Sequence, residues 1–371
     1  MNVDQKSTQV SIPEEILQKW EAKGVSRRDF IKFCTATTAA LALPLSFVPK
    51  VAQALEDKRP PVIWVEYQSC SGDSEAFLRA NQPTAGDIIL ETISLEYSDV
   101  VMAASGHLAE EAKHNAMKKY AGKYVLIVEG SIPRGAGGGY CTIGGKSAVD
   151  DCKELVKNAA ATICVGTCAA FGGLPAAAPN PTDAVSVMDL VPGAPIVNLP
   201  GCPVNATNLT ATIVHFLTFG KLPAVDRLGR PKFAYGKRIH DNCERRSHFD
   251  AGQYAEAFGD AGHSQGWCLY KLGCKGPETF HNCPTCRYNE GVSWPVMAGH
   301  GCIGCSEPGF WDTMSPFYRR LPNVPGFGVE DTADQIGLGL AAATAVAFGA
   351  HGVVNIGRSY FGKNDSDADQ E

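Results

Sequence analysis

The chain has 371 residues, 44% of them hydrophobic, and a formal net charge of −6. This composition predicts a globular protein of about two domains and gives no basic excess for a nucleic-acid partner. The counts of 14 Cys, 39 Gly and 23 Pro predict loop-rich structure held together by more than core packing.

Residues 1–54 have the pattern of a twin-arginine signal peptide. Arg27 and Arg28 precede an uncharged run over residues 35–48, and "VAQA" then predicts cleavage after Ala54. This export route carries proteins that have already folded around a cofactor in the cytoplasm. We therefore expect this segment to lie apart from the mature fold.

Residues 55–235 alternate short apolar runs with amphipathic ones. This rhythm predicts a parallel, doubly wound α/β sheet. The strand-like and helix-like segments are "PVIWVEY" (61–67), "HLAEEAKHNAMKKY" (107–120), "YVLIVEG" (124–130), "AVDDCKELVKNAA" (148–160), "ATICVGTC" (161–168), "PIVNLPGC" (195–202) and "NATNLTATIVHFLTF" (205–219).

Residues 236–330 do not show this alternation and are dense in Cys, Gly, Pro and aromatic residues, which predicts an irregular second domain.

In the last segment, residues 331–371, the run from Ile336 to Ile356 carries no formal charge. Its length of ~31 Å fits a single membrane helix, although a buried helix rich in Ala and Gly is the alternative. Arg358 and Lys363 follow it, which predicts a cytoplasmic C-terminus and a main body on the outer face.

Three cysteines of the first domain follow predicted strands. Cys70, Cys168 and Cys202 each come just past a strand's carboxyl end, where open parallel sheets bind ligands. We expect them to converge. Asp73 stands where a second thiol would complete a C-x-x-C pair with Cys70, so a hard oxygen ligand takes the place of a soft sulfur.

The second domain offers further ligand-like residues, namely His240, Cys243, Cys268, Cys274, Cys283, Cys302 and Cys305, with Cys286 as a spare. Zinc and disulfides are alternatives to iron-sulfur clusters. Removal of the leader leaves an odd number of cysteines, and structural zinc favours compact C-x-x-C pairs. Iron-sulfur clusters accept scattered thiolates and an occasional histidine, so we favour them.

The motifs resemble one family in order and spacing. "SRRDFIKFC", "WVEYQSC", "VGTCAAFGG", "LPGCP", "RIHDNCERRSHFDAG", "WCLYKLGCKGPETFHNCP" and "GCIGCSEPGFWD" are similar to the small subunit of membrane-bound nickel-iron uptake hydrogenases. The resemblance covers nearly the whole chain. It implies a flavodoxin-like domain followed by an irregular iron-sulfur domain, with a C-terminal membrane anchor.

The resemblance also implies three clusters and no catalytic residue in this chain. A proximal 4Fe-4S cluster would be bound by Cys70, Asp73, Cys168 and Cys202, with Asp73 in place of the family's usual cysteine. A medial 3Fe-4S cluster would be bound by Cys283, Cys302 and Cys305, because Pro295 replaces a fourth cysteine, with Cys286 a possible extra ligand. A distal 4Fe-4S cluster would be bound by His240, Cys243, Cys268 and Cys274.

The resemblance also implies partner subunits with different roles. A large subunit would split hydrogen at its nickel-iron site, and this chain would pass the electrons to a membrane cytochrome b and then to quinone. We expect a heterodimer, or a dimer of heterodimers, on the periplasmic face of the cytoplasmic membrane. The alternative function is a periplasmic iron-sulfur subunit of another respiratory oxidoreductase.

Two carboxylates near the proximal motif, Glu66 and Glu75, are expected to be surface or interface charges.

Overall fold

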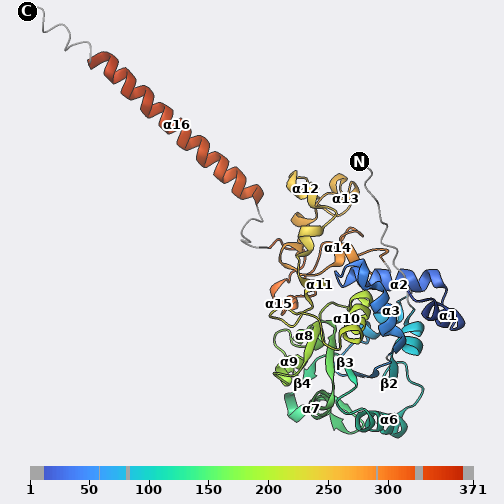
Figure 1. The fold of residues 1–371 in the computed structure, drawn as a ribbon. Coiled ribbons are helices and arrows are strands. Elements are labelled where there is room, and N and C mark those ends of the chain that lie inside the picture. The colour runs from blue at the N-terminus through green and yellow to red at the C-terminus, as the bar shows by residue number, and fades with distance from the viewer. Residues whose placement is uncertain (1–11, 58, 81–83, 290, 322–328, 362–371) are drawn as a thin grey trace, which may run out of the picture. The chain divides into compact units, whose positions relative to one another are not determined.

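The computed structural model describes residues 12–57, 59–80, 84–289, 291–321 and 329–361 (Figure 1). The chain divides into two compact units, between Arg320 and Leu321. Residues on both sides of position 235 belong to the first unit. We call residues 61–235 the sheet region and residues 236–320 the cysteine-rich region.

The sheet region is built on five parallel strands in the order β2-β1-β3-β7-β9. Counted along the chain this order is 2-1-3-4-5, that of flavodoxin-like sheets, so the predicted parallel α/β sheet is confirmed. The sequence did not indicate β2, whose polar residues form a half-buried edge. The strands are β1 (Pro61–Glu66), β2 (Ser94–Ser98), β3 (Val125–Glu129), β7 (Ala161–Val165) and β9 (Ile196–Leu199), with short pairs β4 (Ile132–Pro133), β8 (Ala184–Val185), β5 (Thr142–Ile143) and β6 (Lys146–Ser147).

Helices cover both faces of this sheet (Figure 1). Along β3, Leu126 and Val128 pack with the helices α6 (Gly106–Lys119) and α7 (Ala148–Asn158) on one face. Val125 and Ile127 point to the other face and pack with α4 (Gly72–Leu78) and α10 (Ala206–Phe219). All residues of β3, β7 and β9 are buried, which explains why these strands are continuous apolar runs in the sequence.

Local capping sets where the longer helices begin. The Ser147 side chain accepts the Asp150 N–H at the start of α7, and the Asn205 side chain accepts two N–H groups at the start of α10. Such caps satisfy donors that have no partner inside the helix. The remaining helices of this region are α5 (Ala85–Asp87), η2 (Ile88–Thr92), η3 (Gly135–Gly138), α8 (Gly166–Phe171), α9 (Val187–Leu190) and α11 (Lys232–Tyr235).

The N-terminal segment also folds. It forms α1 (Glu14–Ala22), α2 (Arg27–Ala40), η1 (Leu45–Phe47) and α3 (Val48–Asp57). Trp20 stacks on Phe30 with ring centroids 4.5 Å apart, and both join a core that includes Val214 of α10. Val51 and Ala52, from the expected cleavage motif, are fully buried in α3. The expectation that this segment lies apart from the fold therefore differs from the structure, because its apolar side chains are buried against α10.

The cysteine-rich region contains only short helices and isolated bridges in its described residues. Its core consists of Ile239, Ala255, Leu269, Leu272, Trp294, Val296 and the two cysteines Cys283 and Cys302. Its elements are η4 (Ile239–Asn242), α12 (Arg246–Asp250), α13 (Ala261–Ser264), η5 (Tyr270–Leu272), η6 (Gly276–Glu278), α14 (Cys283–Cys286) and α15 (Phe310–Thr313).

The second unit contains one helix, α16 (Val329–Phe361), in its described residues. Within it, Gly337–Arg358 has 22 residues and a mean hydropathy of 1.6. This stretch is long and apolar enough to cross a membrane, and it contains nearly all of the apolar run expected from the sequence.

Candidate metal centres

The proximal residues gather at the carboxyl edge of the sheet. Cys70 follows β1, Asp73 lies in the first turn of α4, Cys168 lies in α8 directly after β7, and Cys202 follows β9. Desolvation, with contributions from the nearby Asp73 and Cys70, raises the pKa of the Cys168 thiol to about 11. The structure thus brings the four predicted residues together. Cys70 and Cys202 are exposed, so this edge is open on the surface of the chain.

Asp73 is buried and held in place. Its Oδ1 accepts the backbone N–H of Val204 at 2.6 Å, and only 7% of the residue is exposed. Burial and, after it, the neighbouring charge of Glu129 together raise the pKa of this carboxyl to about 8, against the lowering effect of the Val204 hydrogen bond. A positively charged partner would offset that cost, as a metal centre does.

Glu129 is a functional residue that the sequence reasoning missed. It is fully buried at the end of β3 and accepts the N–H of Asp73 at 3.0 Å. It also accepts the N–H of Ser74 at 2.9 Å, the Ser74 hydroxyl at 2.7 Å and the Ser69 hydroxyl at 2.9 Å. Glu129 therefore fixes the loop that carries Asp73. The signal was available, since a charged residue closing an apolar strand at the ligand edge is unusual.

Two glycines make room for the proximal ligands. A Cβ on Gly166, whose φ is +77°, would lie 2.0 Å from Asp73 Oδ2. A Cβ on Gly173, whose φ is +55°, would lie 2.6 Å from Cys168 Sγ. Only glycine fits at both positions, because a side chain would clash and the backbone conformation disfavours one. A thiol at residue 173 could not join the proximal group without moving the backbone.

The distal residues line one small cavity in the cysteine-rich region. His240 comes from η4, Cys243 follows it, and Cys268 and Cys274 flank η5. Burial lowers the pKa of His240 to about 4, with Arg246 the next contribution, so the imidazole is neutral and can bind a metal. Burial raises the pKa of Cys243 to about 11 and of Cys268 to about 12.

The medial residues lie between the other two groups. Cys283 and Cys302 are buried, and the nearby Cys305 adds to the effect of burial in raising the pKa of both thiols. The backbone N–H of Cys302 donates to Cys274 Sγ of the distal group at 3.3 Å. The backbone of Cys202 in the proximal group lowers the pKa of the Cys305 thiol against the raising effect of burial, so the two residues lie close together. The medial group is thus adjacent to both of the others.

Cys286, the possible extra medial ligand, is engaged elsewhere. Its Sγ lies 3.5 Å from Asn205 Oδ1, the oxygen that caps α10. A hydrogen bond with Thr207, in the first turn of that helix, lowers the pKa of the same thiol against the raising effect of burial. The side chain therefore contacts the sheet region.

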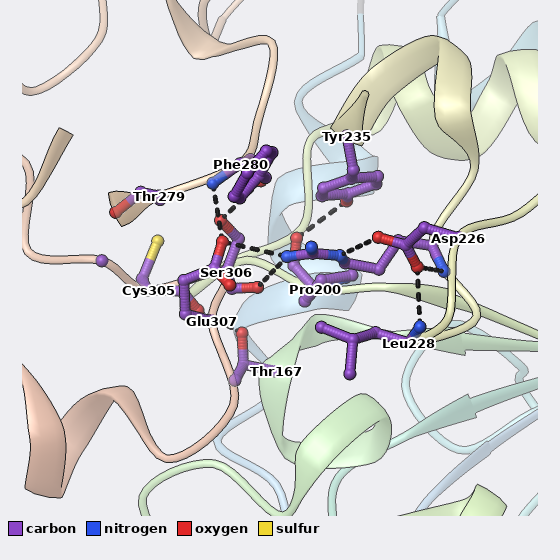
Figure 2. A network of polar contacts seen from close by, with 12 residues as sticks. Thr167, Pro200, Asp226, Leu228, Tyr235, Thr279, Phe280, Cys305, Ser306 and Glu307 are labelled. Atoms are coloured by element: carbon purple, nitrogen blue, oxygen red, sulfur yellow. Dashed lines mark hydrogen bonds and ion pairs between the residues drawn. The ribbon is translucent and has the colours of Figure 1, made fainter. Parts of the chain in front are cut away.

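A buried ion pair ties the medial loops to the sheet region, as Figure 2 shows around Glu307. Glu307 Oε1 accepts from Arg230 Nη1 at 2.9 Å and from the N–H of Phe280 at 2.6 Å. Arg230 also binds Asp226 at 2.8 Å. Thr167, beside Cys168, donates its hydroxyl to the carbonyl of Cys305. These contacts fix the loops of Cys283 and Cys305 against the strand ends that carry the proximal residues.

The geometry bears on the other two interpretations of the cysteines. All 14 cysteines are described and all are free thiols, so the structure gives the disulfide interpretation no support. Within the described ranges, no three His, Cys, Asp or Glu side chains converge closely enough for a single metal ion. The zinc interpretation therefore gains no support. Buried thiols with raised pKa values fit larger cationic groups, which would compensate several thiolates at once.

Comparison with known proteins decides the family. Residues 235–318 match the family model described as the C-terminal part of the NiFe/NiFeSe hydrogenase small subunit, and residues 70–216 match the 20 Kd subunit of NADH ubiquinone oxidoreductase. The chain is 48% identical to the uptake hydrogenase small subunit of Azotobacter vinelandii over 344 residues, covering 92% of this chain and 96% of that one. The chain belongs to the nickel-iron hydrogenase small subunits.

Two further relatives refine this membership. The quinone-reactive Ni/Fe-hydrogenase small chain of Wolinella succinogenes is 49% identical over 345 residues, covering 91% of this chain and 97% of that one. The hydrogenase-2 small chain of Escherichia coli is 51% identical over 288 residues, covering 77% of each. The NiFeSe hydrogenase structure of Desulfomicrobium baculatum matches with a TM-score of 0.67 and 37% identity, covering 71% of this chain and 100% of that one.

This hydrogenase small subunit therefore serves electron transfer in an enzyme with a separate large subunit. The hydrogenase interpretation is favoured over the subunit of another respiratory oxidoreductase. Of the two carboxylates noted in the sequence, Glu75 is exposed on α4 and pairs with Arg79 at 3.8 Å. Glu66 is half-buried, and its pKa is raised by desolvation and by Glu129.

Proposed function

We propose that this hydrogenase small subunit carries electrons away from the large subunit through three iron-sulfur clusters. The ligand sets are those expected from the sequence, and bound clusters would supply one-electron acceptors at each of them. The observation that carries the proposal is the pair of hydrogen bonds that link the three sets: the Thr167 hydroxyl, beside Cys168, to the carbonyl of Cys305, and Cys302 N–H to Cys274 Sγ. Neighbouring sets are thereby adjacent, as a relay requires.

Co-purification from membranes with metal analysis tests the whole assignment. Nickel together with about twelve iron atoms, about eleven of them in clusters and one at the nickel-iron site, would support one large subunit, two 4Fe-4S clusters and one 3Fe-4S cluster. A preparation that holds zinc and no iron would contradict it. The mass of the complex would distinguish a heterodimer from a dimer of heterodimers.

We infer that the exposed proximal edge faces the large subunit. Cys70 and Cys202 are exposed there, whereas Cys283 and Cys302 of the medial set are buried. A thiolate ligand open to water is vulnerable to exchange and oxidation, and a docked subunit would cover it.

Asp73 is proposed as the fourth proximal ligand. Its burial, its raised pKa and its place between Cys70 and Cys168 support this role. Asp73→Ala should change the spectrum and the potential of the proximal cluster, while Asp73→Cys should keep a four-ligand cluster. Glu75→Gln, an exposed carboxylate on the same helix, is the matched control. An unchanged spectrum in Asp73→Ala would show a three-thiolate site.

The medial cluster is proposed to be 3Fe-4S, with Cys283, Cys302 and Cys305 as its ligands. The contact of Cys286 with Asn205 supports three ligands rather than four. Cys286→Ala should leave the medial electron paramagnetic resonance signal intact. Conversion of that signal, or loss of an iron atom, would identify Cys286 as a ligand.

We propose that α16 anchors the subunit in the membrane, where a cytochrome b accepts electrons for quinone. The apolar stretch Gly337–Arg358 and the quinone-reactive relative support this arrangement. The pattern around Arg27 and Arg28 supports export by the twin-arginine route to the periplasmic face. Arg27→Lys with Arg28→Lys should keep the protein in the cytoplasm, which cell fractionation measures. Truncation before residue 329 should release it from the membrane.

A further inference from the structure

His281 lies against a medial ligand in a position that the electron-transfer role does not by itself explain. Its Nδ1 is 3.0 Å from Cys283 Sγ, and only 2% of the residue is exposed. The ring packs edge-on against Tyr235, with centroids 4.8 Å apart and an interplanar angle of 85°. The imidazole therefore contacts a proposed iron ligand on one side and the sheet region on the other.

The backbone on both sides of His281 is fixed. The N–H of Phe280 donates to Glu307 Oε1 at 2.6 Å. The side chains of Asn282 and Asn208 exchange two hydrogen bonds, both 2.9 Å long. Because its two neighbours are anchored to the buried ion pair and to α10, the ring has little freedom to turn away from the sulfur.

The surroundings decide which nitrogen carries the proton. A neutral imidazole has one N–H, and the hydrogen-bond partners of the two ring nitrogens determine which nitrogen carries it. A metal-bound thiolate has no proton and can only accept. The Nε2 atom is buried and has no hydrogen-bond partner among the described residues. A proton on Nε2 would leave a buried donor without a partner, whereas a proton on Nδ1 can be donated to Cys283 Sγ at 3.0 Å.

We propose that His281 is a positioning residue that donates its Nδ1–H to Cys283 Sγ and thereby makes the medial cluster easier to reduce. The inference rests on the proposed iron-sulfur function of this site. Hydrogen bonds to cluster sulfurs raise the reduction potential, because reduction adds negative charge that a donor stabilises. Hydrogen bonds to charged acceptors are also the stronger kind.

One other side chain reaches the same sulfur. Tyr288 is a hydrogen-bond neighbour of Cys283, although its hydroxyl also donates to the carbonyl of Pro203 at 3.2 Å. The two donors can be separated by substitution. His281→Phe keeps a ring against Tyr235 and removes the donor, His281→Asn keeps a shorter donor, and Tyr288→Phe removes only the hydroxyl.

A redox titration of the membrane-purified holoenzyme, followed by electron paramagnetic resonance, measures the effect. In His281→Phe the ratio of reduced to oxidised medial cluster at a fixed potential should fall about tenfold, a shift of about 59 mV for one electron. His281→Asn should fall between this variant and the unaltered enzyme. The proximal and distal potentials should stay unchanged, as internal controls. A medial potential that is unchanged, or that shifts together with the other two, would overturn the proposal.

A second measurement uses the unaltered enzyme and decides the question if a variant fails to assemble. In oxidised holoenzyme labelled with ¹⁵N-histidine, pulsed electron paramagnetic resonance of the medial cluster should detect one histidine nitrogen, together with an exchangeable proton that deuterium oxide removes. Absence of the nitrogen coupling would overturn the proposal. Absence of any medial cluster signal from the unaltered enzyme would instead remove the proposed function itself.

Discussion

The sheet region and the cysteine-rich region are stabilised in different ways. The sheet region has two apolar layers around five parallel strands, and its core needs nothing beyond the chain. The cysteine-rich region has helices of three to five residues and a small core in which Cys283 and Cys302 take part. A region with so little regular structure depends on cross-links, here the proposed clusters. This difference predicts that loss of a cluster ligand will destabilise the cysteine-rich region more than the sheet region.

The largest expected effect comes from removing a buried thiol in each region. Cys302→Ala should abolish the medial cluster and bring amide hydrogen exchange in residues 236–320 close to the unfolded rate, because both medial and distal sets contact this residue. Cys164→Ala removes a fully buried thiol from β7 and should cost about 1 kcal/mol, with protection retained everywhere. Equal losses in the two variants would contradict the comparison.

The next effect concerns the buried ion pair that joins the regions. Glu307→Ala leaves Arg230 with one of its two carboxylates and removes the acceptor of the Phe280 N–H. We expect a loss of about 3 kcal/mol in the free energy of unfolding, with iron lost from the medial set. Asp183→Ala breaks the exposed pair with Arg134 and should cost about 0.2–1 kcal/mol. Denaturant unfolding with iron analysis measures both. A small cost for Glu307→Ala would show that the regions do not depend on this link.

A smaller effect separates capping from bridging at the start of α10. Asn205 accepts two N–H groups of α10 and donates its side-chain amide to the carbonyl of Arg287 at 2.5 Å. Asn205→Ala should cost about 1–2 kcal/mol, because both contacts are lost. Asn205→Asp keeps the cap and removes the donor, so it should cost less and mainly increase hydrogen exchange around residue 287. An equal cost for the two variants would show that only the bridge matters.

The same division explains what could be predicted from the sequence. Strands β1, β3, β7 and β9 are buried on both faces, so each is a continuous apolar run that the sequence displays directly. The edge strand β2 carries polar residues on its exposed side and was not recognisable. In the N-terminal segment, an apolar run is compatible with both a signal peptide and a packed helix, and only the contact with Val214 distinguishes the two in this structure.

The candidate sites follow the same logic. Cys70, Cys168 and Cys202 could be brought together from the sequence because strand order determines where strand ends meet. Glu129 was visible as a charged residue that closes an apolar strand, but its contacts, like those of His281, are made only in the folded protein. Arg230 and Glu307 are 77 residues apart in the sequence, and no local sequence pattern predicts an ion pair between residues so distant.

The smallest effect tests whether mild acid acts on the sheet region. His215 on α10 packs against Phe219 in a tilted arrangement, with ring centroids 4.7 Å apart, and its Nδ1–H donates to the carbonyl of Lys221 at 3.1 Å. Desolvation lowers its pKa below 6.5, with the charge of Lys221 acting in the same direction and the hydrogen bond opposing. The unfolded chain therefore binds this proton at a higher pH than the folded protein does. The stability that neutral His215 contributes is present above about pH 6.5 and is lost as pH falls through the folded pKa.

His215→Gln should remove the part of the pH dependence that comes from His215. Between pH 7 and pH 5 the unfolding midpoint of the unaltered protein should fall more than that of the variant, as thermal unfolding followed by far-ultraviolet circular dichroism would show. In the cysteine-rich region, burial lowers the pKa of His240 and His281 in the same way, so both contribute a slope that the two proteins share. The difference between the two proteins therefore reports His215, and hydrogen exchange at the two pH values should show it around α10. Parallel pH profiles for the two proteins would mean that acid acts elsewhere, and the cysteine-rich region would be the next place to examine.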